Sequence, residues 1–424
     1  MIAVILAGGL GLRLKSVVGD MPKCLVPFNN IPLIGHQLDN LRVNGVNNVI
    51  ILTGYGHDQI RDFCGNGDKW SLNIKYVCES VPLGTAGALR QLRGRVSEDV
   101  LLVSGDIFFD FCFSRMHQAH NAMRPFATVA VHPSDHPYDA NLLEIDENDF
   151  VTGWHLRKNR PDADYFNLTN LSLQILSPNF IEEIFESCFD LWDDMFPQMI
   201  KSGKKILIYR TSEYIRDIGT PERYCAALRD YELGLTRKRN FNNTQKAIFI
   251  DRDGVINHHQ GYINDPNQLE LIRGSAEAIK IINDSGYLVI CITNQPQIAK
   301  GMCDLTTLAR IHKKLETLLA KEGAYLDCIY FCPHGYGIDT ETCNCRKPSV
   351  GMLLKARNRF NLNLSDCYMI GDATRDIQTG INAKMKTILV KTGLAGTDNL
   401  YDCLPDLSFN DLYQAIATIF STCK

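Results

Sequence analysis

The chain has 424 residues, enough for two or three domains. Hydrophobic residues make up 45% and charged residues 22%, as in an ordinary soluble globular protein. The 44 basic and 48 acidic residues give a net charge of −4, so we expect neither a general nucleic-acid binder nor a membrane-surface protein, since both usually carry a basic excess.

Short apolar runs alternate with longer helical patterns along the whole chain. Such runs, rich in β-branched residues, are typical of strands buried on both faces in an α/β fold. Five lie in the first half: Ile2–Leu6, Val49–Thr53, Ile74–Val77, Val100–Val103 and Thr128–Val131. Five lie in the second half: Ala247–Ile250, Leu288–Ile292, Cys328–Phe331, Cys367–Ile370 and Thr387–Val390.

The polar, Asn-rich segment 236–245 separates the two sets and predicts a linker between domains 1–235 and 246–424. We expect both domains to be Rossmann-like. An apolar stripe near the C-terminus predicts one packing helix, with Leu412, Ile416, Ile419 and Phe420 on its buried face.

The sequence also bears on the cellular compartment, on membrane association and on the oligomeric state. No apolar run approaches the roughly 20 residues of a membrane span, so we expect no membrane association. The start Met1–Ala7 is short, lacks a basic leader and runs into glycines, which indicates a strand and not a signal peptide. The 15 scattered cysteines are typical of reduced thiols, which predicts a cytoplasmic protein. The sequence is also compatible with a homo-oligomer.

The first strand runs into a glycine-rich turn that contains Gly8, Gly9 and Gly11 and is followed by Arg13 and Lys23. Backbone N–H groups in such a turn can approach phosphate oxygens, and the two cations suit a triphosphate. A tight turn without a ligand is the alternative interpretation.

Further segments of the first half follow in a characteristic order. Glu79-Ser-Val-Pro-Leu-Gly84-Thr85-Ala-Gly comes first, then Ser104-Gly105-Asp106 at a strand end, then Arg216-Asp217-Ile-Gly-Thr-Pro. Taken singly, Asp106 could cap a turn and Thr220-Pro221 could start a helix. Together with the glycine turn, they resemble the sugar-phosphate nucleotidyltransferases over roughly residues 1–235.

That resemblance implies a mixed sheet and in-line attack of a sugar 1-phosphate on the α-phosphorus of a nucleoside triphosphate. It implies catalytic roles for Arg13 and Lys23, Mg²⁺ binding by Asp106 and Asp217, and sugar-phosphate binding by Lys158 and Asn170. It assigns the nucleotide to Gly8, Gly9, Gly11, Glu79, Gly84 and Thr85. Two departures concern the sugar: Arg157 replaces a usual acidic residue, and Asn170-Leu-Ser replaces Asn-Ala-Gly.

In the second half, Asp251-Arg252-Asp253-Gly254 directly follows a strand. Two carboxylates there project into the crevice where open α/β sheets bind ligands, and one can attack phosphorus while the other moves protons. An ordinary Asp-Gly turn is the alternative. Three more pieces follow in order: Thr293-Asn294 at a strand end, Arg346-Lys347-Pro348, and Gly371-Asp372 with Asp376.

This order resembles the haloacid-dehalogenase-type phosphatase superfamily over roughly residues 246–396, which implies a parallel sheet. The resemblance makes Asp251 the nucleophile that becomes an aspartyl phosphate and Asp253 the general acid and base. It implies phosphate binding by Thr293, Asn294, Arg346 and Lys347. It places Mg²⁺ on Asp372, Asp251 and the backbone carbonyl of Asp253, with Asp376 in support.

A cysteine cluster precedes Arg346: Cys332-Pro-His334, then Cys343-Asn-Cys345. Three thiolates and one imidazole form a closed tetrahedral set, typical of a structural zinc site. Unpaired cysteines beside a stray histidine are the alternative. A zinc-held loop would position Arg346 and Lys347, which follow the last ligand.

The zinc loop and the segment 251–257 together resemble the D,D-heptose 1,7-bisphosphate phosphatases. Three departures concern the sugar preference: Pro296-Gln297 replaces Ser-Gly, Gly335 replaces a second histidine, and the stretch from His334 to Cys343 is short.

Both resemblances converge on one pathway. They imply that the second half removes the 7-phosphate of D-glycero-D-manno-heptose 1,7-bisphosphate. The first half would then transfer GMP from GTP to heptose 1-phosphate, giving GDP-D-glycero-α-D-manno-heptose and pyrophosphate. GTP and heptose rest on resemblance alone. One alternative is a hexose 1-phosphate guanylyl- or uridylyltransferase fused to a phosphatase of another small sugar or polyol phosphate. A second alternative makes one half a degenerate binding or regulatory module.

Overall fold

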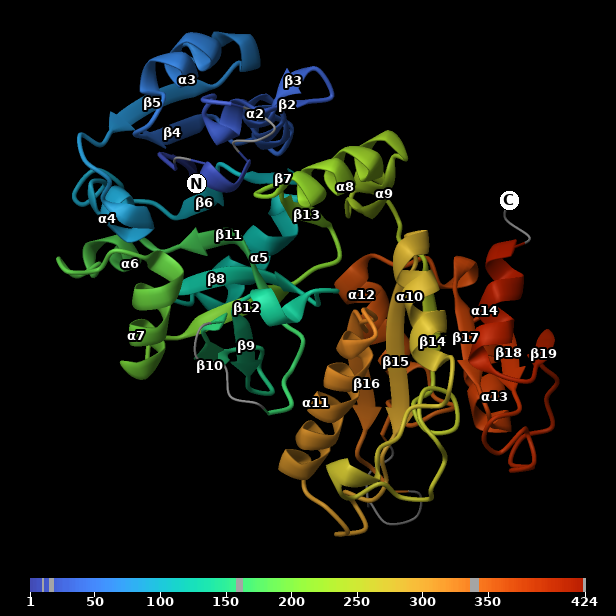
Figure 1. The fold of residues 1–424 in the computed structure, drawn as a ribbon. Coiled ribbons are helices and arrows are strands. Elements are labelled where there is room, and N and C mark those ends of the chain that lie inside the picture. The colour runs from blue at the N-terminus through green and yellow to red at the C-terminus, as the bar shows by residue number, and fades with distance from the viewer. Residues whose placement is uncertain (10, 15–18, 158–162, 336–342, 422–424) are drawn as a thin grey trace. The chain divides into compact units, whose positions relative to one another are not determined.

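The computed structural model describes residues 1–9, 11–14, 19–157, 163–335 and 343–421 (Figure 1). The chain divides into two compact units. The first is built mainly from Met1–His132 and Thr169–Asn242, and the second mainly from Asn243–Lys424. None of the helices in the described ranges has the length and apolarity that crossing a bilayer requires.

The first unit is built on a mixed nine-stranded sheet. Its strands are β1 (Ile2–Ala7), β4 (Asn48–Thr53), β5 (Asn73–Cys78), β6 (Val100–Ser104), β8 (Ala127–His132), β9 (Leu142–Ile145), β10 (Val151–His155), β11 (Thr169–Leu176) and β12 (Ile206–Arg210). The order is β10-β9-β11-β6-β1-β4-β5, and β8 pairs with both β11 and β12. Strands β6, β1, β4 and β5 are parallel, whereas β11 runs antiparallel to β6 and β8.

Helices and two small ribbons complete this unit. The helices are α2 (Leu33–Val43), α3 (His57–Cys64), α4 (Gly84–Arg90), α5 (Phe113–Met123), α6 (Pro178–Glu182), α7 (Phe196–Lys201), α8 (Pro221–Glu232) and α9 (Leu235–Arg239). Apolar side chains of α2, α3 and α5 pack with the central strands in one core. The ribbons are β2 (Pro27–Phe28) with β3 (Ile31–Pro32), and β7 (Ile107–Asp110) with β13 (Tyr214–Asp217).

The segment expected to be a linker is more ordered than its composition predicts. Its first residues belong to helix α9, and Phe241 is buried. The Arg115 guanidinium carbon lies 5.0 Å from the centroid of the Phe241 ring. The backbone N–H of Phe241 donates to Glu213 Oε1 over 3.0 Å. These tertiary contacts, which polarity alone does not reveal, hold the segment on the first unit.

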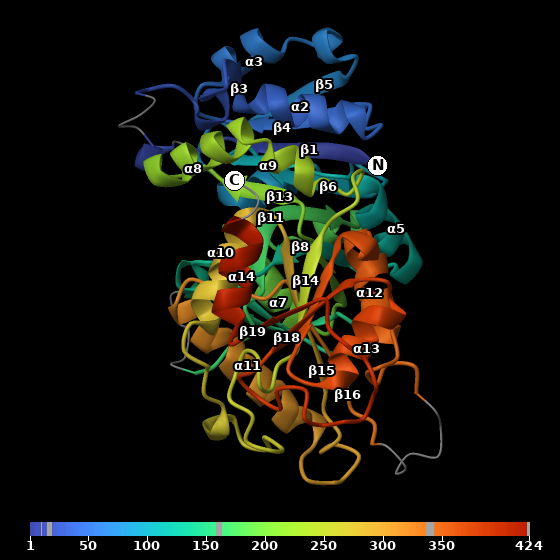
Figure 2. The same ribbon diagram turned by 90° about the vertical axis from the view of Figure 1, so that its right-hand side faces the viewer.

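The second unit is built on a six-stranded, all-parallel sheet in the order β16-β15-β14-β17-β18-β19. The strands are β14 (Ala247–Ile250), β15 (Leu288–Asn294), β16 (Cys328–Cys332), β17 (Tyr368–Gly371), β18 (Lys386–Val390) and β19 (Leu407–Phe409). The helices are α10 (Ser275–Ser285), α11 (Leu305–Lys321), α12 (Gly351–Phe360), α13 (Thr374–Asn382) and α14 (Leu412–Ser421). Figure 2 shows α10, α11 and α14 on one side of the sheet and α12 and α13 on the other.

The structure confirms the expected α/β class, with a mixed sheet followed by a parallel one. All ten predicted strands form, each within about two residues of its expected bounds, and the apolar stripe near the C-terminus forms α14. Most of their side chains are buried, although β5 and β16 consist largely of half-buried or exposed residues. Burial of the other strands explains why continuous apolar runs predicted them.

Candidate functional sites

A cavity of about 620 Å³ lies at the carboxyl ends of β1, β4 and β6 in the first unit. Seven of the predicted site residues line it: Gly8, Gly9, Lys23, Glu79, Gly84, Thr85 and Asp106. Tyr55, Gln91, Phe189 and Trp192 also line it and carried no recognisable signal in the sequence. The cavity has the size and the mixed polar and apolar lining of a small-molecule site.

Two glycines of this cavity are required by close approach. A Cβ on Gly8 would lie 2.8 Å from Glu79 Oε1, and a Cβ on Gly84 would lie 2.2 Å from the carbonyl oxygen of Phe189. Gly84 also has a φ of +73°, which side chains rarely tolerate. The bare backbone at Gly8 leaves room for the Glu79 carboxylate, whose Oε2 accepts from the Leu83 N–H over 3.1 Å, and the bare backbone at Gly84 leaves room for Phe189.

Asp106 and Asp217 are brought together by the β7–β13 ribbon, whose register places Asp217 opposite Ile107. Lys23 forms an ion pair with Asp106 Oδ2 and lies 3.9 Å from Asp217 Oδ1. Arg223 pairs with Asp217 Oδ2. Burial alone would raise the pKa of Asp106, but Lys23 and the hydrogen bond from Ser104 together hold that pKa below its ordinary value.

These two carboxylates fit a divalent cation. Asp106 and Asp217 each turn one oxygen toward the same ammonium group, so a single ion could be shared between them. Carboxylate oxygens are the ligands that Mg²⁺ prefers.

The remaining predicted residues of this unit lie less centrally. Arg13 is exposed, and its Nη2 would lie 3.3 Å from a Cβ on Gly219. Asn170 Oδ1 accepts from the Ser172 N–H over 3.1 Å, so this amide is already engaged in the irregular start of β11. Gly11 has a φ of +61° and packs on Lys23. Lys158 lies outside the described residues.

In the second unit, Lys347 is the centre of the site. Its side chain is fully buried, and Nζ lies 2.8 Å from Asp251 Oδ2, 2.7 Å from Asp376 Oδ1 and 3.0 Å from the Ile292 carbonyl oxygen. Burial would lower the pKa of Lys347, but Asp251 and Asp376 outweigh it and raise that pKa. Burial raises the pKa of Asp251 to about 6, against the opposing effect of Lys347.

Asp253 is held by five hydrogen bonds from three side chains. Arg252, which is itself fully buried, donates from Nε and Nη2 over 2.8–3.1 Å. Asn257 and Gln295 donate over 2.9 and 3.0 Å. Burial raises the pKa of Asp253, but Arg252 together with the hydrogen bonds from Asn257 and Gln295 outweighs burial, and the pKa lies below its ordinary value. Asp253 is thus held as a carboxylate two residues along the chain from Asp251.

Asp251, Asp372 and Asp376 form an acidic cluster whose oxygens lie within 4.8 Å of one another. Asp372 Oδ1 is buried and has no hydrogen-bond partner among the described residues, while Oδ2 accepts from the Leu394 N–H over 2.6 Å. Burial and then the charge of Asp251 raise the pKa of Asp372 to about 6. An unpaired oxygen in an all-oxygen set fits a hard divalent cation such as Mg²⁺.

Three other predicted phosphate-binding residues are engaged with neighbouring groups. Thr293 Oγ1 accepts from Gln295 over 2.7 Å. The Asn294 amide donates to the Lys347 carbonyl oxygen over 3.2 Å and accepts from its N–H over 3.0 Å. Arg346 donates to the His334 carbonyl oxygen over 3.0 Å. Asn294 and Arg346 therefore fix the backbone around Lys347.

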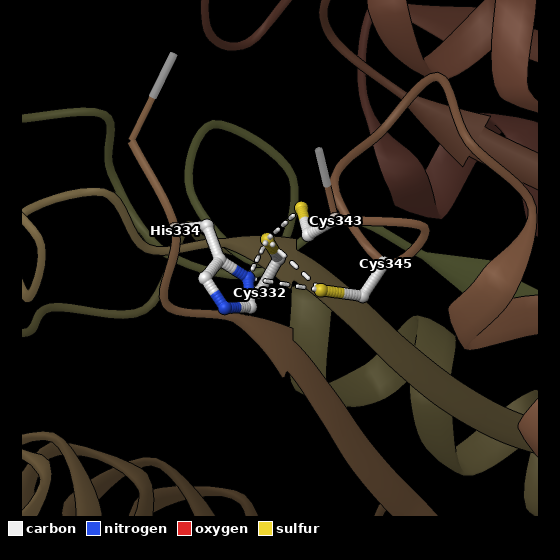
Figure 3. Close-up of side chains that lie close together, drawn as sticks. All are labelled: Cys332, His334, Cys343 and Cys345. Atoms are coloured by element: carbon white, nitrogen blue, oxygen red, sulfur yellow. Dashed lines mark hydrogen bonds between the residues drawn. The ribbon is translucent and has the colours of Figure 1, made fainter. Parts of the chain in front are cut away.

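The cysteine cluster assembles as the sequence predicts (Figure 3). The Cys332 sulfur lies 3.5 Å from His334 Nδ1, 3.7 Å from Cys343 Sγ and 3.2 Å from Cys345 Sγ, and His334 Nδ1 lies 3.3 Å from Cys345 Sγ. Zn–S bonds of about 2.3 Å in a tetrahedron require sulfurs about 3.8 Å apart. The cluster is slightly more compact and fits a metal ion of this kind.

Two positioning arginines were not predicted from the sequence. Arg223 follows a helix start, and the sequence around it predicts an exposed helical residue. Arg252 lies between two aspartates, and the sequence around it predicts a turn residue. No spacing rule marks either, because the Arg223 pairing depends on how α8 leaves β13 and the role of Arg252 depends on its complete burial.

Comparisons with known proteins agree with this division. The Nucleotidyl transferase family model matches residues 2–233, more than half of the chain, and the HAD-hydrolase-like model matches residues 344–415. A D-glycero-beta-D-manno-heptose-1,7-bisphosphate 7-phosphatase of Pasteurella multocida (strain Pm70) is 40% identical over 159 residues, which are 37% of this chain and 86% of that protein. The protein of the same name from Escherichia coli (strain K12) is 36% identical over 178 residues, 40% of this chain and 93% of that protein.

Among solved structures, HddC from Yersinia pseudotuberculosis complexed with GMP-PN is 27% identical. The match covers 54% of this chain and 99% of that one, with a TM-score of 0.47.

Proposed function

We propose that this chain, which belongs to the nucleotidyl transferase family through residues 2–233 and to the D-glycero-beta-D-manno-heptose-1,7-bisphosphate 7-phosphatase family through its C-terminal part, is a bifunctional enzyme of heptose activation. The second unit removes the 7-phosphate of heptose 1,7-bisphosphate. The first transfers GMP from GTP to the resulting heptose 1-phosphate. The products are GDP-heptose, phosphate and pyrophosphate.

The main observation that supports the proposal is that one chain contains two candidate sites, one in each unit. The Asp251–Lys347–Asp376 cluster lies in a region 36–40% identical to proteins named for heptose bisphosphate. The cavity with Lys23 and Asp106 lies in a region that matches nucleotidyl transferases. Removal of the 7-phosphate by the second unit yields a sugar 1-phosphate, which is the class of acceptor that the nucleotidyl transfer in the first unit needs.

In the phosphatase step, Asp251 attacks the phosphorus of the 7-phosphate, and the bond to O7 breaks. Asp253, in the form that carries a proton, gives that proton to O7; it then takes a proton from the water that hydrolyses the aspartyl phosphate. Lys347 offsets the repulsion between a carboxylate and a phosphate dianion. Mg²⁺, when bound by the acidic residues of each site, supplies positive charge to the phosphoryl oxygens.

In the transferase step, an oxygen of heptose 1-phosphate attacks the α-phosphorus of GTP, and pyrophosphate leaves. Lys23 and Arg13 neutralise the charge that develops on the leaving group. The glycine turn lets backbone N–H groups approach the phosphates.

The choice of guanine is supported by the chemistry of Glu79, whose carboxylate lines the cavity. Guanine presents an N1–H and an N2 amino group as neighbouring donors, which a carboxylate can accept together. Uracil offers one donor between two carbonyl oxygens, which a carboxylate repels. Glu79→Gln is expected to reduce the preference for GTP over UTP at least about tenfold, since an unmade bond to a charged group costs about 1.5–3 kcal/mol.

The anomer must be the same for both units, because hydrolysis at C7 does not touch C1. The relatives are named for the beta anomer, whereas the motif resemblance points to the alpha product. Both anomers of the bisphosphate are therefore the substrates to compare, with mannose 1-phosphate as the hexose control.

Two variants separate the activities. Asp251→Asn is expected to abolish phosphate release from heptose 1,7-bisphosphate while heptose 1-phosphate is still converted to GDP-heptose. Lys23→Met is expected to do the reverse. If either variant, shown by circular dichroism to be folded, loses both activities, the model of two independent sites is wrong.

A further inference from the structure

Lys23 occupies the space between two carboxylates. Its side chain is largely buried, 13% exposed, and its ammonium group pairs with Asp106 Oδ2 while lying 3.9 Å from Asp217 Oδ1. A Cβ on Gly219 would lie 2.9 Å from Lys23 Nζ and 2.5 Å from Asp217 Oδ1, so the backbone also closes tightly on this group. The two carboxylates and the backbone at Gly219 therefore enclose the Lys23 ammonium group, unlike a chance contact on the surface.

The other oxygens of both carboxylates have partners of their own. Asp106 Oδ1 accepts from the Ser104 hydroxyl over 2.6 Å, and Asp217 Oδ2 accepts from Arg223. Of the two oxygens that face Lys23, Asp217 Oδ1 also accepts from the Gly219 N–H over 2.5 Å. A carboxylate oxygen has a second lone pair, so this oxygen and Asp106 Oδ2 are still the ones that a shared divalent cation would bind. An ammonium group and a divalent cation cannot occupy this space together, because their charges repel at contact distance.

We infer that Lys23 is the resident counter-ion of Asp106 and Asp217 and transfers to the triphosphate when nucleotide binds, which frees the two carboxylates for Mg²⁺. This inference rests on the proposed nucleotidyl transfer and adds to it an order of events. Lysine suits such a transfer, since it is a point charge on a flexible four-carbon stem. Lys23 lines the same cavity as Gly8 and Gly9, so the phosphate-binding turn lies within the same enclosure.

A consequence is that metal and nucleotide bind cooperatively in this unit. A metal ion that binds alone must displace the Lys23 ammonium group from the two carboxylates. When nucleotide is bound, Lys23 already contacts the triphosphate and the carboxylates are free for the metal ion. By linkage, each ligand strengthens the binding of the other by the same factor. Removing the Lys23 charge should therefore strengthen metal binding in the absence of nucleotide, although it destroys catalysis.

The test measures Mn²⁺ binding to the full chain by electron paramagnetic resonance. All proteins carry Asp372→Asn, which weakens cation binding by the second unit. With Lys23 intact, we expect weak Mn²⁺ binding that tightens when a non-hydrolysable GTP analogue is added. In Lys23→Met, Mn²⁺ alone should bind at least about tenfold more tightly, within the usual range of coupling between two ligands, and the analogue should add little.

Arg13→Met is the matched control, because it removes the same charge near the same cavity without a contact to either carboxylate. We expect its Mn²⁺ affinity to change less than about threefold, as for a partly screened charge. Lys23→Gln should behave like Lys23→Met if both fold. The inference is overturned if neither Lys23 variant binds Mn²⁺ alone more tightly than Arg13→Met. If Mn²⁺ binds to none of the proteins even with the analogue, the assignment of Asp106 and Asp217 as metal ligands fails, and the proposed transfer mechanism with it.

Discussion

Replacing Lys347 by methionine is the most informative single change in the second unit. The substitution keeps all but the terminal heavy atom of the side-chain length and removes a buried charge that lies 2.8 Å from Asp251 and 2.7 Å from Asp376. Two buried carboxylates are then left without their common cation, and the Ile292 carbonyl oxygen loses its donor.

The expected cost follows from this geometry. Breaking a buried ion pair by removing one partner costs about 3–5 kcal/mol. Proton uptake limits the loss here, because burial already raises the pKa of Asp251 to about 6 and removal of Lys347 raises it further. We therefore expect about 3 kcal/mol at pH 7. For a domain of this size, that lowers the melting temperature by about 6–12 °C.

The pH dependence has a definite sign. A carboxyl group whose pKa is raised by folding stabilises the protein at low pH and loses that contribution as pH rises through the raised value. The deficit of Lys347→Met should therefore be small at pH 5 and grow toward pH 8. Phosphatase activity should fall at least about 100-fold, the usual cost of removing a group that stabilises transition-state charge.

The assay is thermal unfolding followed by circular dichroism from pH 5 to 8, with phosphate release measured in parallel. Lys321→Met, at the exposed end of α11, is the matched control and should leave both quantities unchanged. A melting temperature within 2 °C of the wild type at every pH would refute the argument that Lys347 neutralises two buried charges.

Three further predictions concern other parts of the chain. Burial raises the pKa of Glu213 to about 8, so the first unit should lose stability as pH rises from about 5 to 8, and Glu213→Gln should remove that slope in thermal unfolding. Cys345→Ser should lower the bound zinc, measured by atomic absorption, while Cys403→Ser should not; unchanged zinc in Cys345→Ser would mean that the cluster is no metal site. Gly219→Ala should reduce GDP-sugar formation at least about tenfold and spare phosphate release, because the new Cβ would lie 2.5 Å from Asp217 Oδ1; equal activities of the two proteins would contradict the tight fit.

Much of the fold was predictable because its strands are buried on both faces. Ile248 and Ile250 in one unit and Val4 and Ile5 in the other are fully buried, and such positions leave continuous apolar runs. The paired β7 and β13 were not predicted as strands. They are short, and β7 immediately follows β6, so no apolar run sets them apart.

The sites were predictable where chemistry follows a strand end. Asp251 and Asp372 each do so, Thr293 is the penultimate residue of β15, and parallel strands end at one edge of a sheet. Contacts between distant side chains carry no such signal. The hydrogen bond from Gln295 to Asp253 joins residues on two separate loops, and the pairing of Arg223 with Asp217 depends on how α8 leaves the β13 strand.

The most direct test of the whole account is product analysis with the purified chain. Heptose 1,7-bisphosphate, as each anomer, is incubated with GTP and Mg²⁺, and the products are followed by mass spectrometry. The account predicts that phosphate appears first and that GDP-heptose and pyrophosphate then accumulate from one anomer. If heptose 1-phosphate accumulates without GDP-heptose, the nucleotide or sugar assigned to the first unit is wrong. If the bisphosphate of both anomers remains intact, the heptose assignment itself is contradicted.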